Sequence, residues 1–142
     1  RELYVGVIGN ERLKVLPVWE LDFGKLPETG EPIATAHVKH NPEYQKKHGI
    51  DIRRADDLDP AVERALQRTT RRVYRMLELD GYARVDYRLT AANEIYLLEA
   101  NPNPEIAEKE EFASAAAASG LKYKPLLQRL VQLGLSRSGR PD

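Results

Sequence analysis

Four polar residues near the middle of the chain, Arg84, Asp86, Glu99 and Asn101, are of the types that hold a cation and stabilise negative charge. One residue separates the first two, and one separates the last two. In extended chain, each pair therefore lies on one face of its strand. Two carboxylates and an amide supply the hard oxygen ligands that Mg²⁺ prefers.

Two predicted strands, Tyr82–Leu89 and Glu94–Ala100, carry these residues, and the short turn Ala91–Asn93 joins them into a hairpin. A turn centred on residues 92 and 93 places Asp86 opposite Glu99. The same register sets Arg84 opposite Asn101, Val85 opposite Ala100, Tyr87 opposite Leu98 and Leu89 opposite Tyr96.

Opposed carboxylates repel each other unless they share a proton or a cation lies between them. The pattern therefore indicates a divalent-cation site. A second interpretation is an ordinary charged sheet face, with Asp86 and Glu99 in solvent and Arg84 and Arg88 neutralising them. A one-residue shift of register would undo the pairing, so the residue pattern leaves both interpretations open.

The elements expected before this hairpin begin with another one. Strands over Leu3–Ile8 and Leu13–Leu21 are predicted, and Pro17 indicates an edge or a bulge in the second. A short strand is expected over Ile33–Ala36. The segment Lys39–Gly49 is polar and predicts a long loop, which is either a lid over a ligand or a solvated connection.

The strongest helical pattern runs from Pro60 to Leu79, with Asp59 as N-cap and Gly81 as the left-handed stop. Its expected buried stripe consists of Val62, Leu66, Thr69, Val73, Met76 and Leu77. The arginines on the rest of this helix are interpreted as a solvated face.

Two further helices are predicted near the end of the chain. An alanine-rich helix is expected over Ala107–Ala118, ending at Ser119 and Gly120. The last helix is expected over Pro125–Leu133, with Gly134 as its stop, and residues 136–142 as a disordered tail. The predicted fold class is α+β, a mostly antiparallel sheet flanked by helices.

Composition excludes several classes of function. Among the 142 residues, 22 Lys+Arg balance 22 Asp+Glu, so no net charge recruits nucleic acid or an anionic membrane. The lack of cysteine excludes a disulfide framework, a cysteine-ligated zinc site and a thiol nucleophile, and it agrees with a cytoplasmic protein. Because the chain opens at Arg1 and enters a strand at once, we expect it to be a piece of a longer protein.

The runs Gly81–Tyr87 and Ile95–Pro104 resemble the C-terminal core of ATP-grasp enzymes, above all the D-alanine–D-alanine ligase branch. There, an Arg-x-Asp strand is followed by a Glu-x-Asn strand, a proline-containing loop and two helices. The opening Arg1–Val7 resembles the strand that follows the adenine-contacting hinge. The resemblance implies that residues 1–135 are the C-terminal half of an ATP-grasp fold, and that the other half lies in a missing N-terminal part of the same protein.

The resemblance also implies roles for individual residues. Asp86, Glu99 and Asn101 would bind one or two Mg²⁺ ions, for which Mn²⁺ could substitute, bridging the phosphates of ATP. Arg84 would be the catalytic residue that stabilises the acyl phosphate and the tetrahedral oxyanion.

Two cofactor-binding residues are implied outside the second hairpin. Glu2 would hold the ribose hydroxyls of ATP, and Lys39 would reach the γ-phosphate. The alternatives are a strand-end charge for Glu2 and a solvated loop charge for Lys39.

The sequence departs from the family after Asn101. Glu105 stands where the family has an oxyanion-hole glycine, and Glu108–Glu111 replaces a serine-containing stretch that grips a substrate carboxylate. These acids are either first-turn helix charges, or an acidic wall that disfavours an acceptor carboxylate unless Lys109 compensates. The second interpretation predicts an amine-bearing or cationic acceptor.

The activity implied for the parent protein is ATP-dependent ligation of a small carboxylate to an amine through an acyl phosphate, with amino-acid-like or peptide-like substrates. The fragment alone would be inactive, and a homodimer is one option for the parent. Two alternatives remain. One is another ATP-grasp ligase that modifies amino acids or peptides, and the other is a non-catalytic nucleotide-binding module.

Overall fold

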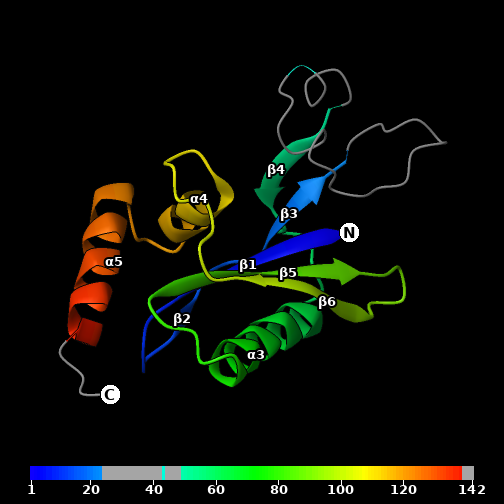
Figure 1. The fold of residues 1–142 in the computed structure, drawn as a ribbon. Helices are drawn as coiled ribbons and strands as arrows, with labels where there is room; N and C mark the ends of the chain where they lie inside the picture. Colours follow the sequence, from blue (N-terminus) through cyan, green and yellow to red (C-terminus); the bar gives the residue numbers. More distant parts are fainter. Residues whose placement is uncertain (24–42, 44–48, 139–142) are drawn as a thin grey trace.

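The computed structural model describes residues 1–23, 43 and 49–138 (Figure 1). The strands are β1 (Glu2–Ile8), β2 (Lys14–Val15), β3 (Trp19–Asp22), β4 (Asp51–Arg54), β5 (Tyr82–Leu89) and β6 (Ile95–Asn101). The helices are α3 (Pro60–Met76), α4 (Glu111–Ala118) and α5 (Tyr123–Ser138). In the described part, the strands form one antiparallel sheet in the order β4-β3-β1-β5-β6, with β2 also paired to β1.

The helices cover both faces of this sheet. Helix α3 lies against one face, and α4 and α5 lie on the other, near the end of β1 that leads to β2 (Figure 1). The core beneath α3 is built from the alternate residues of β1 and β5 that point to that face, including Leu3, Val5, Val85 and Tyr87. The predicted α+β class is therefore confirmed.

The first hairpin is confirmed, but its second strand is divided in two. Both β2 and β3 pair with β1, and the break falls at Leu16–Val18, around Pro17. Proline has no backbone N–H to donate to a ladder. On either side of it, Leu16 N donates to Gly6 O at 2.8 Å, and Val18 O accepts from Ala55 N at 3.0 Å.

Strand β4 was not predicted. It pairs with β3, and its sequence is mostly charged. Arg53 lies opposite Glu20 and forms ion pairs with Glu20 at 2.8 Å and Asp22 at 3.0 Å. The predicted strand Ile33–Ala36 lies outside the described residues, as does most of the predicted loop Lys39–Gly49.

Helix α3 begins as predicted and ends earlier than predicted. The carboxylate of Asp59 accepts a hydrogen bond from Ala61 N at 2.6 Å, which confirms the N-cap. The helix ends at Met76. Two residues later, the backbone of Glu78 is left-handed, with φ of 52°. Gly81 also has a positive φ, but it leads into β5 and does not stop the helix.

The buried stripe of α3 follows a four-residue spacing and consists of Val62, Leu66, Thr70 and Tyr74. The prediction that Met76 and Leu77 belong to this stripe is wrong. These two residues are 70% and 54% exposed, past the part of α3 that packs on the sheet. The two polar members were missed. Their hydroxyls are satisfied, because Thr70 shares a hydrogen bond with Tyr87 at 2.9 Å and Tyr74 donates to Gly9 O at 2.8 Å.

Truncating the centre of this stripe should destabilise the chain. Leu66 is fully buried, so we expect Leu66→Ala to cost about 2–5 kcal/mol of unfolding free energy through lost contacts and a cavity. The same change at the exposed Leu77 should cost within about 0.5 kcal/mol. Urea denaturation followed by circular dichroism measures both. Equal losses at the two positions would contradict the assignment of the buried face.

The last two helices differ from the predicted bounds. Helix α4 begins at Glu111 rather than Ala107. Helix α5 passes through Gly134 to Ser138, so the predicted stop at Gly134 is wrong, and residues 136–138 are helical rather than part of a tail. Asn10 anchors this helix end, donating to Leu133 O and Ser136 Oγ, each at 3.1 Å.

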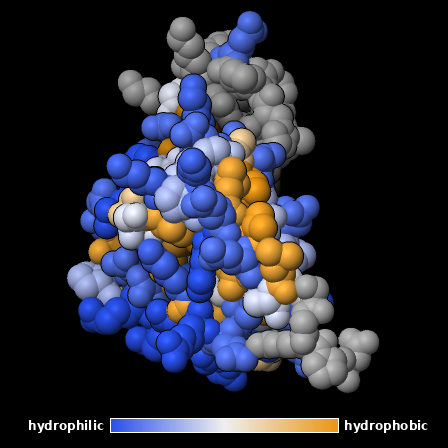
Figure 2. All heavy atoms as spheres, turned by 90° about the vertical axis from the view of Figure 1, so that its left-hand side faces the viewer, coloured by the Kyte–Doolittle hydropathy of each residue, from blue (hydrophilic) through white to orange (hydrophobic). Residues whose placement is uncertain are grey.

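One side of α5 is exposed and apolar. Figure 2 shows a band of apolar side chains on this outer surface, and its members Leu127, Val131 and Leu135 follow one another at successive helical turns. The other side of α5 is buried through Leu126 and Leu133. No helix in the described part of the chain is long and apolar enough to cross a membrane.

Gly6 allows α4 to lie close to the sheet. A β-carbon at this position would come within 2.7 Å of Leu16 Cδ1 and 3.1 Å of the Phe112 ring. Phe112 occupies that space and meets the Tyr82 ring edge-on, with centroids 5.6 Å apart. This close packing places the preceding residue, Glu111, directly over the sheet.

Candidate functional site

The sheet face that carries α4 also carries the residues singled out in the sequence. Across the sheet, Tyr4 of β1 lies opposite Asp86 of β5, which lies opposite Glu99 of β6. The predicted pairing of Asp86 with Glu99 is therefore confirmed. The neighbouring predicted pair, Arg84 with Asn101, is confirmed as well.

A bulge lies next to this row and was not predicted. The register shifts between Asp86 and Tyr87, so that Tyr87 pairs with Leu97 rather than Leu98. Leu89 likewise pairs with Ile95 rather than Tyr96. The extra residue, Leu98, is 52% exposed beside Glu99.

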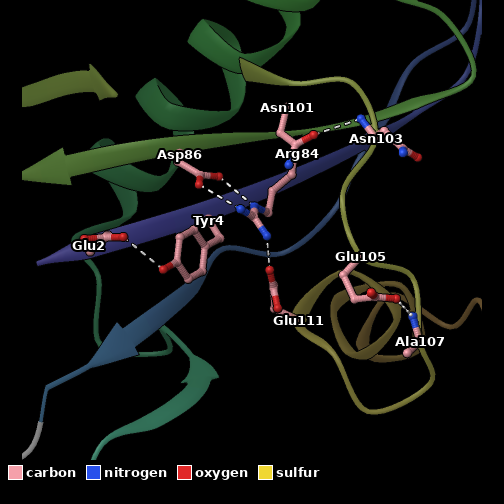
Figure 3. Close-up of polar contacts among 9 residues, drawn as sticks. All are labelled: Glu2, Tyr4, Arg84, Asp86, Asn101, Asn103, Glu105, Ala107 and Glu111. Atoms are coloured by element: carbon pink, nitrogen blue, oxygen red, sulfur yellow. Dashed lines mark hydrogen bonds and ion pairs between the residues drawn. The ribbon is translucent and has the colours of Figure 1, made fainter. Parts of the chain in front are cut away.

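Arg84 lies at the centre of the site and is held by two carboxylates (Figure 3). Its Nε and Nη2 donate to the two oxygens of Asp86 at 2.7 and 2.9 Å, a bidentate pair along one strand. Its Nη1 donates to Glu111, which approaches from α4. The guanidinium also lies 4.8 Å from the centre of the Tyr4 ring.

The surroundings keep Arg84 charged. Burial alone would lower its pKa, but the hydrogen bonds to Asp86 and the charges of Asp86 and Glu111 outweigh it and raise the pKa above its ordinary value. Burial, followed by the charge of Glu2, raises the pKa of the Tyr4 hydroxyl. Tyr4 therefore stays neutral and acts as a hydrogen-bond donor.

Glu2 lies on the same face, in the row opposite Arg88. It is 4% exposed and accepts hydrogen bonds from Tyr4 Oη at 3.0 Å and Arg88 Nη2 at 3.2 Å. Glu2 is thus a buried part of the site face rather than a solvated strand-end charge. Lys39 lies outside the described residues.

The charged-face interpretation fits only part of the site. Asp86 is 3% exposed and bound to Arg84, whereas Glu99 is exposed at the sheet edge. Arg88 donates to Glu2, which lies in the next row of the same face. In the ranges that the structure describes, no three His, Cys, Asp or Glu side chains come close enough to hold a metal ion by themselves.

The oxygen donors fit magnesium, which keeps water and phosphate ligands beside one or two carboxylates. Asp86 uses both oxygens to hold Arg84, but each carboxylate oxygen has a second lone pair. The side-chain oxygen of Asn101 accepts from Asn103 N at 2.9 Å, which orients it at the end of β6. Two carboxylates and one oriented amide are a suitable partial ligand set.

The acidic segment after β6 does not form a single wall. The carboxylate of Glu105 accepts from Ala107 N at 2.9 Å and stabilises the loop. Glu108 and Lys109 are exposed and precede α4, whereas Glu111 opens the helix and is bound to Arg84. This partner of Arg84 was not predicted, because no local pattern links two residues that lie so far apart in the sequence.

The chain matches the family described as "D-ala D-ala ligase C-terminus" over residues 1–132. It is 33% identical over 138 residues to the D-alanine–D-alanine ligase of Desulfotalea psychrophila, covering 97% of this chain and 40% of that protein. It is 32% identical over 141 residues to the D-alanine–D-alanine ligase of Desulforudis audaxviator, covering 96% of this chain and 40% of that protein.

Solved structures share the fold. The D-alanine–D-alanine ligase of Coxiella burnetii superposes with a TM-score of 0.73 at 24% identity, over 96% of this chain and 32% of that chain. The D-alanine–D-alanine ligase of Bacillus anthracis complexed with ATP superposes with a TM-score of 0.69 at 18% identity, over 95% of this chain and 38% of that chain. The chain spans about 40% of the length of these curated relatives. It belongs to the family of D-alanine–D-alanine ligase C-terminal domains, and it has the C-terminal part of an ATP-grasp fold.

Proposed function

We propose that the protein carrying this chain is an ATP-dependent carboxylate–amine ligase, and that this chain supplies the magnesium- and phosphate-binding part of its active site. The observation that carries the proposal is the row in which Asp86 lies opposite Glu99, with the partly buried Arg84 bound to Asp86 beside it. Membership of the ligase family supports it. The remaining part of the active site would come from the rest of the same protein.

Asp86, Glu99 and Asn101 would hold one or two Mg²⁺ ions. Bound Mg²⁺, or Mn²⁺ in its place, would neutralise negative charge on the phosphates of ATP. The cation would also remove the repulsion between the opposed carboxylates, which otherwise disfavours this pairing.

Arg84 has N–H donors left that could bind a substrate. Guanidinium has five N–H donors, and among the described residues the bonds to Asp86 and Glu111 use three of them, which leaves two. These two donors would face oxygens that gain negative charge in the reaction. Because Arg84 is fixed before the substrate arrives, no reorganisation is needed at that step.

The reaction that suits these groups has two displacements. A carboxylate oxygen of the donor attacks the γ-phosphorus of ATP, and ADP leaves. The nitrogen of the acceptor amine then attacks the acyl carbon, phosphate leaves, and the nitrogen loses a proton. Neither displacement needs a nucleophilic side chain, so positioning and charge stabilisation carry the catalysis.

We also propose that Glu2 accepts hydrogen bonds from the ribose hydroxyls of ATP and that Lys39 contacts the γ-phosphate. The buried carboxylate of Glu2 on the site face supports the first assignment. The family resemblance alone supports the second. A cytoplasmic setting, where ATP is available, suits this activity, and a homodimer stays a prediction.

The proposal is tested by ADP release from the full-length protein in Mg²⁺. Donor and acceptor would be drawn from amino acids of both hands, dipeptides and small amines. We expect release that requires both an acid and an amine, and that stops when EDTA removes the metal. Hydroxylamine added without an acceptor should trap the activated acid as a hydroxamate.

The two alternatives give different results. Turnover only with donors unrelated to alanine would identify another amino-acid- or peptide-modifying ligase of the superfamily. ATP binding without ADP release, for every acid and amine tested, would contradict the ligase proposal and favour a non-catalytic nucleotide-binding module.

A further inference from the structure

Glu111 occupies one side of Arg84 in a setting largely withdrawn from water. The side chain of Glu111 is 7% exposed and that of Arg84 is 12% exposed. Charge interactions are much stronger in such surroundings than at the surface. A charged group of a substrate that approaches Arg84 therefore meets Glu111 as well.

The position of Glu111 is fixed by the packing of α4. The next two residues, Phe112 and Ala113, are 1% and 2% exposed, and Phe112 lies over Gly6 with its ring against Tyr82. This packing fixes the backbone of Glu111 beside the sheet, and the ion pair with Arg84 holds its carboxylate in place. Glu111 is thus a built-in part of the site.

The charges around Arg84 disfavour a carboxylate on the acceptor. Its one positive charge is bound by Asp86 and Glu111, and the negative charge of Glu99 lies opposite Asp86 on the next strand. A Mg²⁺ ion held by Asp86 and Glu99 would be shared with the phosphates of ATP, so it would leave no positive charge over for a carboxylate of the acceptor. A carboxylate on the acceptor would then add an uncompensated negative charge next to Glu111, which is unfavourable in a poorly solvated site.

We propose that Glu111 is a specificity-determining residue, which selects an acceptor amine with no carboxylate on the carbon next to its nitrogen. The acceptor class is a primary amine, diamine or amino-acid amide. Such an acceptor approaches as an ammonium ion, which the carboxylate of Glu111 attracts. The inference rests on the proposed ligase function and narrows its second substrate.

The test compares acceptors that differ only in this charge. Glycine and glycinamide, and D-alanine and D-alaninamide, would be supplied to the full-length protein with the donor acid that gives the fastest ADP release. Mass spectrometry would identify the products. We expect kcat/KM for each amide to exceed that for its amino acid by about tenfold or more. In Glu111→Gln, which keeps the shape and removes the charge, this preference should fall by about tenfold.

Two further variants separate charge from structure. Glu111→Asp keeps the charge and should keep the preference for amides, so it covers the case in which Glu111→Gln fails to fold. Glu108→Gln removes an exposed acid of the same segment and should leave the preference within about twofold.

The outcomes are distinct. A wild-type preference for amino acids would overturn the inference, as would an equal effect of Glu111→Gln on both acceptors of a pair. Amino-acid use that depends on Lys109 would also overturn it, since the exposed lysine would then supply the missing positive charge. No ADP release with any acceptor would instead overturn the proposed function on which the inference rests.

Discussion

Replacing Arg84 by lysine is expected to lower kcat of the full-length protein by about 10²- to 10³-fold, the cost of losing a preorganised donor to a developing oxyanion. Lysine keeps the positive charge but lacks the planar fork. It cannot reproduce the bidentate contact with Asp86, the bond to Glu111 and two outward N–H groups together. The loss should appear mainly in kcat, because the oxygens concerned gain charge only during the reaction.

Steady-state ADP release measures this effect. Arg64→Lys is the matched control, since Arg64 is exposed on α3, and it should leave kcat unchanged. A thermal midpoint close to that of wild type would show that Arg84→Lys still folds. A kcat for Arg84→Lys within about threefold of wild type would contradict the role assigned to the guanidinium.

Replacing Glu99 by glutamine is expected to lower turnover at a fixed Mg²⁺ concentration by about 100-fold or more, because a direct carboxylate ligand is lost. Raising the Mg²⁺ concentration should restore part of the rate. Titration of Mn²⁺ with ATP present, followed by electron paramagnetic resonance, should show the weaker metal affinity without reference to activity.

The same substitution should not destabilise the metal-free protein. It removes a like-charge repulsion between Glu99 and Asp86, so we expect the free energy of unfolding to stay constant or rise by up to about 1 kcal/mol. Glu94→Gln makes the same chemical change on an exposed residue of the hairpin and should alter neither property. Unchanged Mn²⁺ affinity in Glu99→Gln would remove Glu99 from the metal site.

The second hairpin could be predicted well because period-two alternation and a short turn constrain it locally. The pairing of Asp86 with Glu99 was nevertheless predicted from a register that is wrong at the turn. There, Leu89 pairs with Ile95, and the extra residue Leu98 restores the predicted register before Asp86 is reached. A bulge leaves no reliable mark in a single sequence, so its compensating effect could not be foreseen.

Features that depend on contacts between distant segments were not predictable. Strand β4 is charged and short, and it exists because β3 offers an edge and Glu20 offers a partner for Arg53. Glycine is the residue type that most often ends a helix, yet α5 continues through Gly134 to Ser138. Asn10 donates a hydrogen bond to Ser136 near that end. Tertiary contacts outweigh local propensity at both positions.

The contact between Arg84 and Glu111 is the clearest example of a feature that could not be predicted from the sequence. The acids after Asn101 were visible in the sequence, but which of them reaches the sheet depends on where α4 begins. That point is set by the packing of Phe112 against Gly6, which involves the opposite end of the chain. A local sequence pattern therefore cannot indicate that Glu111 comes close to Arg84.

The bulge at Leu98 also makes the hairpin convenient for protein engineering. It divides the strand pair into a tip, where Leu89 faces Ile95, and a site end, where Asp86 faces Glu99, each with its own register. The tip residues Ala91 and Ala92 are exposed. A peptide tag or a dye-labelled segment inserted between them would lengthen the turn and leave the carboxylates facing each other. The tip is thus a suitable attachment point for a reporter of nucleotide binding.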